Sequence, residues 1–539
     1  MGKKYDKKVK KNRYIYDALY GPIYLPDFIW NVISCPELQR LREVRLCNIN
    51  SLCLTGGANI NRYEHAIGTC YLAQICLENW PPLNPISENE IKYFLLAALL
   101  HDVVSGAFGH SIQYIEGFEH EKDFKYVITG EKGGRYQYRS LSTEPIFFGM
   151  QRELLERIGD VFKEKSLIKI MEHVEKIGEI IAGRGRFGPL INSIMDLDNI
   201  DNVFRLAYHI GLVNSGEIPL KLAKSLYIKD NKLVIKKEAI PLIEKWYDVR
   251  KKLYSFLLLN PEEFSAKCML TEAIELAKIK ERQPFSWYHV DFEVLEKLHK
   301  ISFIRISFKK LISYDITSNE KLKKELDKSI IPEEFKPILK QCGIDVSSPI
   351  NIEKINDDEW KIKSNKECIV KDKRKKFFIY EIHPGSRDIS EIVSRLMKGE
   401  LYGCIGIFST SKIEKNDIFT SFDEKRELED ELSSIIRKFG SNFKRAMIAI
   451  HSIIDVDKTE RQVIIQTEDN KTIKVGRSSK QLLIGVFFRN NDINMYKLDN
   501  IEPKKLNKFR QEVYKYLSEI LYDPKLQEMK LYGEVDGCE

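Results

Sequence analysis

Hydrophobic and polar residues follow two different patterns along this chain, and the change falls near residue 310. Before it, apolar residues recur every three or four positions, the spacing that places them on one face of a helix. This spacing predicts helices over residues 64–80, 91–101, 151–182, 191–212, 239–258 and 264–279. Loops are predicted where the pattern is broken, at Pro81-Pro82, Gly133-Gly134, Gly183–Gly188 and Asn260-Pro261.

The second half of the chain has a mixed pattern. Residues 315–373 are rich in Lys, Glu and Asp, and short apolar stretches typical of β-strands follow at 377–382, 404–408, 447–454, 462–466 and 482–488. A hairpin is predicted around Glu468-Asp469-Asn470, and a helix over 506–522. We therefore expect a mainly α fold: a disordered basic tail at 1–13, a helical domain at 14–310, and an α+β domain at 311–539 that serves regulation or oligomerisation.

Composition narrows the class of protein. The 539 residues are 43% hydrophobic and 31% charged, and no run of 18 apolar residues occurs, so we expect a soluble protein without a membrane span. Ten scattered cysteines without a Cys-x-x-Cys pair predict a reduced, cytoplasmic location. The net charge of +7 is small for a dedicated nucleic-acid binder but suits a protein with polyphosphate ligands.

Metal-binding residue types cluster at the ends of predicted helices. His101 and Asp102 follow the apolar run Phe94–Leu100, where charged groups are costly to bury unless they are paired or bound to a metal. His65 precedes them, and an acidic segment containing Asp198 and Asp201 follows. Imidazole and carboxylate together favour a transition metal over calcium. The order His, His-Asp, Asp is the sequence outline of a metal-dependent phosphohydrolase.

Each of these residues also has an ordinary structural interpretation. His65 alone fits a buried, hydrogen-bonded histidine, and the His101-Asp102 pair fits a helix C-terminal cap. The acidic segment at 196–201 fits a solvated helix face. The residues in this order, with their flanking positions, favour a metal site inside a helical bundle over any of these separate interpretations.

Several longer motifs carry a family resemblance. They are Gln39–Arg42, Asn61–Gly68, Leu99–His110, Asp196–Gly211 and Arg250–Ala273. They resemble the motifs of the HD-superfamily deoxynucleoside triphosphate (dNTP) triphosphohydrolases, the group of bacterial dGTPases and sterile-alpha-motif HD proteins. The resemblance covers roughly the first 280 residues, through the stretches 17–68, 96–121, 192–211 and 247–273, and it implies a helical HD-domain core.

The resemblance also implies roles for individual residues. One divalent metal ion (Mn, Mg, Fe, Zn, Ni or Co) would be bound by His65, His101, Asp102 and Asp198. His110 and His120 match active-site histidines, either of which would protonate the leaving oxygen, with Glu121 orienting His120. Arg62 and Arg250 match positions that hold the triphosphate, and Asn202 matches a substrate-binding position. Without the motifs, His110 and His120 would be interpreted as partly buried structural histidines. Arg62 and Arg250 would be interpreted as surface or ion-pair residues.

The implied reaction is hydrolysis of a dNTP to a deoxynucleoside and triphosphate. The implied partners are dNTPs, further copies of the chain in a homo-oligomer, and a second nucleotide as activator. Defence against phage by dNTP depletion is one hypothesis for its biological role. Nucleic-acid binding is a weaker expectation, based on the basic segments at Lys3–Lys11 and Lys371–Lys376.

The chain departs from the family at several positions. Ser105 stands where relatives often have a catalytic histidine, and a serine hydroxyl is no general acid at neutral pH. Asn202 and Leu206 replace residues that lie around the nucleoside in some relatives, and Leu258 replaces a tyrosine that lies against the sugar. Two alternatives therefore stay open: another HD nucleotide phosphohydrolase or phosphodiesterase, and a catalytically weakened sensor of nucleotides or nucleic acid.

Overall fold

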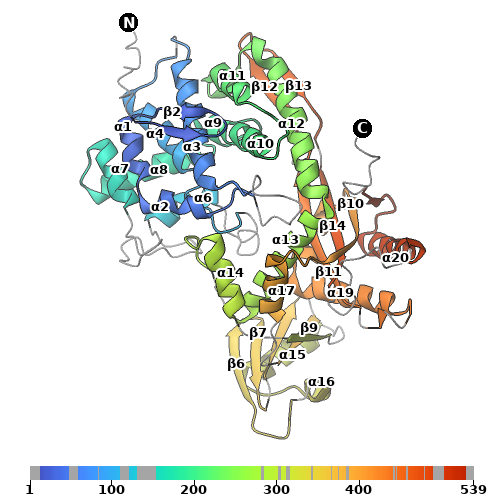
Figure 1. Ribbon diagram of the computed structural model, residues 1–539. Helices are drawn as coiled ribbons and strands as arrows, with labels where there is room; N and C mark the ends of the chain where they lie inside the picture. Colours follow the sequence, from blue (N-terminus) through green and yellow to red (C-terminus); the bar gives the residue numbers. More distant parts are fainter. Residues whose placement is uncertain are drawn as a thin grey trace.

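The fold is mainly α-helical, with several small sheets contributed largely by the C-terminal region, as the sequence predicts. The computed structural model describes residues 13–47, 59–82, 84–109, 120–129, 153–280, 285–301, 305–310, 316–341, 344–365, 367–373, 376–383, 388–440, 443–444, 446–456, 459–478, 480–489 and 503–529. Figure 1 shows the helices of the first half gathered above the C-terminal sheets. The predicted basic tail lies almost wholly outside the described residues.

The N-terminal helices pack into two cores: those from α1 to α12 surround one large core, and α13 and α14 belong to a second core shared with C-terminal elements. They are α1 (Asp27–Ile33), α2 (Pro36–Gln39), η1 (Arg40–Glu43), α3 (Arg62–Glu78), α4 (Glu88–Leu100), α6 (His120–Thr129), α7 (Leu154–Phe162), α8 (Leu167–Ile181), α9 (Gly188–Ile191), α10 (Leu197–His209), α11 (Glu217–Ser225), η3 (Lys237–Ala239), α12 (Ile240–Leu259), α13 (Pro261–Lys280) and α14 (Asp291–Lys300). α3 and α4 lie at the centre, and Phe94–Leu100 are all buried.

Polar caps fix where the central helices begin. Asn61 accepts from the backbone N–H of Glu64 at the start of α3, and Ser87 forms a capping box with Glu90 at the start of α4. Asp196 caps α10 in the same way. Packing of α3 against α4 and α10 then brings the first turn of α3, the end of α4 and the first turn of α10 together in the core.

Two predicted helices are each divided in the structure. The helix expected over 151–182 is interrupted after α7 because Lys163 adopts a left-handed conformation, φ 58°, which ends a helix. The helix expected over 191–212 begins only at Leu197, because Asp196 is an extended cap residue. In the second case the break puts the acidic residues in the first turn of α10 rather than in its middle.

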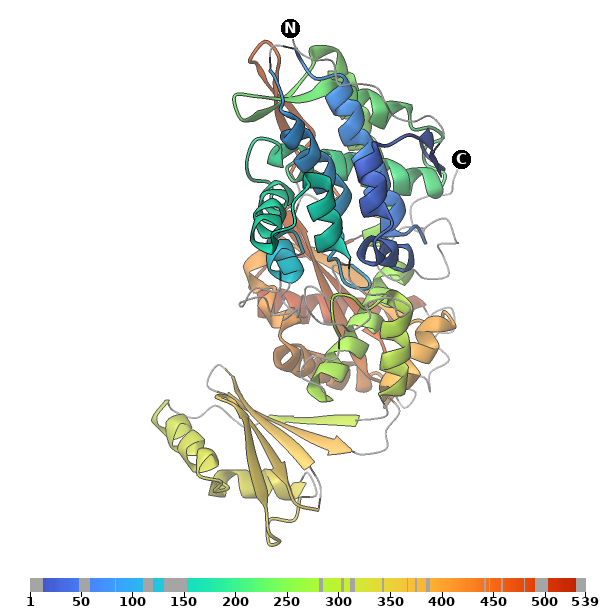
Figure 2. The same cartoon turned by 90° about the vertical axis from the view of Figure 1, so that its left-hand side faces the viewer.

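The C-terminal elements form three further layers. The helical elements are α15 (Ile316–Asp327), η4 (Glu333–Phe335), α16 (Lys336–Gln341), α17 (Asp388–Met397), η5 (Ile413–Lys415), α18 (Asp417–Thr420), α19 (Phe422–Arg437) and α20 (Pro503–Leu521). One sheet has the order β5-β9-β8-β7-β6, from β5 (Arg305–Lys310), β6 (Asn351–Asn356), β7 (Glu359–Lys363), β8 (Glu367–Lys373) and β9 (Lys376–His383). With α15 and α16 this sheet projects from the rest of the molecule (Figure 2).

The second C-terminal sheet packs on the end of the helical part. Its order is β11-β14-β10-β15, from β10 (Gly403–Thr410), β11 (Ile448–Val456), β14 (Lys480–Phe488) and β15 (Gln527–Glu528). Phe264 and Met269 of α13 share a core with Ile407 and Leu483 of this sheet. Packing therefore runs across residue 310, and the domain division predicted there stays a prediction.

A third sheet brings the C-terminal chain back into the first core. β3 (Leu226–Lys229) and β4 (Lys232–Ile235) form a hairpin, and β12 (Val463–Thr467) pairs in parallel with β4, with β13 (Thr472–Val475) outside it. Val463 and Ile465 are buried in the same cluster as the N-terminal helices. Figure 1 shows β12 and β13 beside α11 and α12, far from the other C-terminal strands.

A two-stranded hairpin, β1 (Ile15–Asp17) and β2 (Gly21–Ile23), lies at the start of the described chain. Among the helices that the structure describes, none has both the length and the apolar character needed to cross a bilayer.

Candidate metal centre

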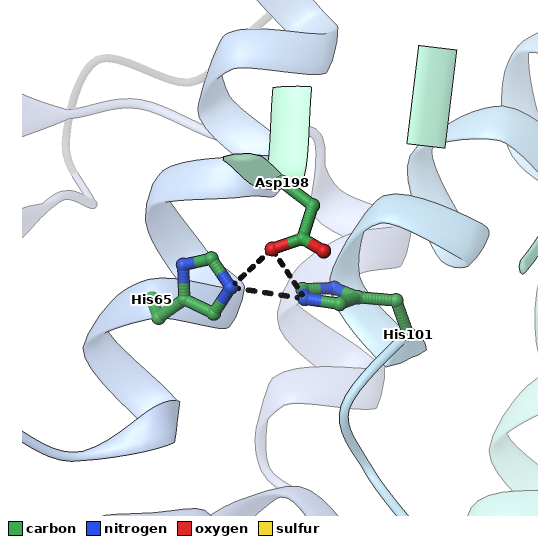
Figure 3. Close-up of side chains that lie close together, drawn as sticks. All are labelled: His65, His101 and Asp198. Atoms are coloured by element: carbon green, nitrogen blue, oxygen red, sulfur yellow. Dashed lines mark hydrogen bonds and ion pairs between the residues drawn. The ribbon is translucent and has the colours of Figure 1, made fainter. Parts of the chain in front are cut away.

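Three metal-binding side chains meet where the central helices converge (Figure 3). His65 comes from the first turn of α3, His101 follows the last turn of α4, and Asp198 lies in the first turn of α10. The Nε2 atom of His65 lies 2.9 Å from Oδ1 of Asp198 and 3.1 Å from Nε2 of His101. The Nε2 atom of His101 lies 3.7 Å from the same Asp198 oxygen.

Both imidazoles are held so that Nε2 faces the centre of this cluster. Nδ1 of His65 donates to Oδ2 of Asp201 at 2.8 Å, and Nδ1 of His101 donates to the carbonyl of Ala98 at 2.9 Å. Because a carboxylate and a carbonyl only accept, each Nδ1 carries the hydrogen. The second ring nitrogen is then available as a ligand. This donor set fits a divalent transition metal.

The charges around His65 favour a cation at this position. Burial opposes protonation of the ring, but hydrogen bonds to Asp198 and Asp201 outweigh it and raise the pKa of His65 to about 9. Burial likewise opposes ionisation of Asp198, yet the two histidines hold its pKa below the usual value. His65 and Asp198 therefore share a proton when no metal is bound. A metal ion that binds there would have to displace this proton.

Asp201 belongs to a buried network behind His65. Arg205 donates to Asp201 through Nε at 2.9 Å and to Asp17 of β1 at 2.8 Å, and the hydroxyl of Tyr20 donates to Asp201 at 2.8 Å. Burial opposes the charge on Asp201, but Arg205 and His65 lower its pKa to about 2. A Cβ on Gly68 would collide with Asp201 and Arg205, so α3 needs glycine there.

Asp102, predicted as a fourth ligand, lies beside the cluster with additional partners. Its Oδ2 is 3.6 Å from Nε2 of His101 and 3.9 Å from Nε2 of His65, but it also lies 2.5 Å from Nη1 of Arg62. Burial raises the pKa of the carboxyl group, and Arg62, His101 and His120 together hold it well below the ordinary value. Asp102 is therefore ionised, and its role as a ligand stays a prediction.

Of the two histidines predicted to be catalytic, the structure describes His120 and not His110. Nε2 of His120, buried at the start of α6, lies 3.2 Å from Oδ1 of Asp102 and 3.2 Å from Glu121. Burial opposes its protonation, and Glu121 and Asp102 raise its pKa. Ser105 donates to the same Asp102 oxygen at 2.8 Å. His110 lies outside the described residues.

A cavity of about 1090 Å³ opens beside the cluster. The predicted substrate-binding residues Arg62, Asn202 and Arg250 line it, together with Leu206 and Leu258. The Nε atom of Arg62 is buried and has no hydrogen-bond partner among the described residues. A guanidinium group in the wall of a cavity suits an anionic ligand.

The far wall of this cavity and the network behind His65 were not predicted from the sequence. Lys425, His451 and Arg461 line the cavity from the C-terminal half of the chain. No motif or spacing links them to the histidines, because only the three-dimensional packing of α19, β11 and β12 brings them there. Asp17 and Tyr20 were missed for the same reason.

Comparisons with known proteins agree with this arrangement. Residues 62–183 match the family model of the HD domain. The chain is 24% identical over 274 residues to the uncharacterised protein YwfO of Bacillus subtilis, covering 50% of this chain and 57% of that protein. It is 25% identical over 284 residues to the deoxynucleoside triphosphate triphosphohydrolase SAMHD1 homolog of Dictyostelium discoideum, covering 51% and 52%.

The chain thus spans about half the length of the curated relatives it matches. Among solved structures, a phosphohydrolase from Bacteroides thetaiotaomicron superposes with a TM-score of 0.47 and 15% identity, covering 89% of this chain and 100% of that chain.

Proposed function

Because the chain carries an HD domain at residues 62–183, we propose that the protein is a metal-dependent phosphohydrolase that converts a dNTP to a deoxynucleoside and triphosphate. The observation that carries the proposal is the convergence of two Nε2 atoms and a carboxylate oxygen beside a cavity with arginines in its wall. The substrate class rests on the resemblance and on the similarity to the Dictyostelium protein named above.

His65, His101 and Asp198 would hold the ion, with Asp102 as the proposed fourth ligand. A bound divalent ion supplies Lewis-acid polarisation of a phosphoryl oxygen. The residues behind the cluster keep both imidazoles in fixed orientation, since each Nδ1 has its own acceptor. This preorganisation supports a site that binds metal without rearranging its ligands.

The cavity wall supports binding of a polyphosphate. Arg250 is buried, with its guanidinium over the ring of Tyr254 at 4.5 Å and Nη1 3.4 Å from Asn199. Arg62 is paired with Asp102 through Nη1 and lies in the wall of the same cavity. We propose that these two arginines bind the triphosphate and that His120 protonates the leaving oxygen, with His110, which lies outside the described residues, as the other candidate.

One observation favours a second candidate function. Ser105 stands where relatives often have a histidine, and it donates to Asp102 instead of offering an acidic proton to a substrate. This supports the alternative of a slow enzyme or a nucleotide-binding sensor. Another HD nucleotide phosphohydrolase or phosphodiesterase stays open as well, because the cavity does not select a product.

The test is product analysis with the purified full chain. Each dNTP is incubated with Mn²⁺ or Mg²⁺, singly and in pairs, and the products are separated by ion-exchange chromatography. Inorganic triphosphate and a deoxynucleoside are expected; a monophosphate or orthophosphate would instead support the phosphodiesterase alternative. Nucleotide binding without any turnover would support the sensor.

Variants make the assay specific for the candidate centre. His101→Ala should abolish product formation, whereas His173→Gln should leave it unchanged. His173 is a matched control because it lies in α8 against Phe162 and outside the cavity. Homo-oligomer formation, activation by a second nucleotide and defence against phage stay predictions from the resemblance, and the paired dNTP arms address activation.

A further inference from the structure

The segment that leads into β12 carries an arginine to the cavity. After β11 the chain leaves the C-terminal sheet and enters the N-terminal core, with Thr459 anchored to Asp455 and Glu460 paired with Lys251 of α12 at 2.6 Å. β12 then continues as a neighbour of β4. Both ends of this short segment are fixed, so the position of Arg461 between them is fixed as well.

Arg461 lies beside Arg250 at the cavity wall. Its Nη1 donates to Oδ1 of Asn199 at 3.2 Å and to the carbonyl of Ile194 at 3.1 Å, while Nη1 of Arg250 lies 3.4 Å from the same Asn199 oxygen. Asn199 is itself held by Asp196, which accepts from its Nδ2 at 3.0 Å. One amide oxygen, next in sequence to Asp198, thus brings together two guanidinium groups from distant parts of the chain.

Two guanidinium groups side by side in the wall of a cavity together attract an anion that can approach both of them. Burial lowers the pKa of Arg250, and Arg461 adds to the effect through its charge. Both arginines line the cavity that also contains the candidate metal centre. Guanidinium groups bind phosphate oxygens through two parallel N–H groups, so a pair of them suits successive phosphates of one chain.

We propose that Arg461 binds the phosphates of the substrate together with Arg250, so that the C-terminal segment 459–467 completes the substrate site of the HD domain. The proposal rests on the proposed function for the identity of the substrate as a nucleoside triphosphate. Its ligand chemistry, a linear polyphosphate, rests on the two arginines alone. The HD domain without this segment would then hold metal but bind nucleotide weakly.

The kinetic test compares Arg461→Gln with Glu460→Gln in the full-length protein. Losing a charged, bidentate contact should raise KM for the dNTP at least tenfold while kcat changes little, because the contact is made equally before and during the reaction. Glu460→Gln removes the partly exposed ion pair between the neighbouring residue of this segment and Lys251 of α12, and it should leave KM within twofold. Equal KM values for wild type and Arg461→Gln would overturn the proposal.

A conservative variant covers the case in which Arg461→Gln loosens the segment. Arg461→Lys keeps the charge but loses the bidentate hydrogen-bond donor. Its KM is expected to lie between those of wild type and Arg461→Gln, with an unchanged melting temperature. If Lys restores wild-type KM, the charge alone matters and the bidentate contact is wrong. If both variants lower the melting temperature and kcat together, Arg461 is structural and the proposal fails.

A binding measurement separates this proposal from the proposed function. Inorganic tripolyphosphate is titrated calorimetrically into the protein with chelator present, so that no reaction takes place. Binding by wild type that weakens at least tenfold in Arg461→Gln supports the proposal even if no dNTP is hydrolysed. Equal binding by the two proteins, or no binding by wild type, overturns it even if hydrolysis is found.

Discussion

The Nδ1 atom of His65 lies 2.8 Å from Oδ2 of Asp201, and both side chains are almost wholly buried. This contact fixes which nitrogen of the ring carries a hydrogen and which nitrogen faces Asp198. The candidate metal centre therefore depends on a residue that is not itself placed to bind the metal.

Replacing Asp201 with Asn should weaken metal binding and lower stability. The variant leaves the buried Arg205 with one carboxylate fewer, a change that costs about 3 kcal/mol in comparable buried pairs. Losing the orienting carboxylate should lower metal affinity by about 10- to 100-fold. Urea unfolding of the chelated protein and equilibrium dialysis with Mn²⁺ measure the two effects separately.

Tyr20→Phe is the matched control, since it removes the hydrogen bond from the Tyr20 hydroxyl to Asp201 and keeps those from His65 and Arg205. It should cost about 1 kcal/mol and leave metal affinity nearly unchanged. Equal metal affinity in wild type and Asp201→Asn would contradict the orienting role.

Metal should stabilise the folded protein in a way that depends on the cluster. A ligand present at 100 times its dissociation constant adds about 2.7 kcal/mol of stability. Thermal melting with and without Mn²⁺ should therefore show an upward shift for wild type and for His173→Gln. His65→Ala should show no shift, and a full shift in that variant would place the metal elsewhere.

Gly68→Ala should destabilise the protein although alanine favours helices. Alanine gains about 1 kcal/mol in helix propensity over glycine. Here its Cβ would collide with the Asp201 and Arg205 side chains, which are locked in a buried network, and overpacking of this kind costs about 1–3 kcal/mol. A variant that unfolds at the same or higher urea concentration than wild type would show that the network can move aside.

His451 should make stability fall as the pH is lowered. Burial and the neighbouring Lys425 and Lys267 lower its pKa to about 3, so it stays neutral in the folded protein. The unfolded chain takes up a proton below about pH 6.5. Stability is therefore present above that pH and is lost as the pH falls toward 3, by about 1 kcal/mol per pH unit from this residue. Comparing urea unfolding at pH 7 and pH 5, His451→Gln should lose less stability than wild type.

The helices that supply the candidate centre were predictable because their signals are local. The apolar runs of α3, α4 and α10 have helical spacing, and their caps lie within three residues of the first turn. The strands β6–β8 were not predicted. β7, for example, buries Trp360 and Ile362 but has charged residues at 359, 361 and 363. Two apolar residues are too few to be recognised as a strand within a segment that is otherwise rich in charge.

The parts of the site that were not predictable depend on contacts between distant segments. Asp17 and Arg205 are paired across 188 residues, and neither position has a neighbour in sequence that indicates the other. Arg461 likewise reaches Asn199 only because β12 leaves its own sheet to join β4. Sequence patterns report local periodicity, whereas these contacts depend on how the whole chain is packed.

The pairing of β12 with β4 also means that one strand of this sheet is synthesised well before its partner. A ribosome makes the segment that matches the HD domain long before it makes residues 463–467, so β4 emerges with one edge unpaired and open to strand addition. The apolar contacts of Val463 and Ile465 are missing until then as well. A nascent or truncated chain that stops before β12 is therefore exposed to aggregation through that edge, and the N-terminal core is complete only after residues 463–467 have been made.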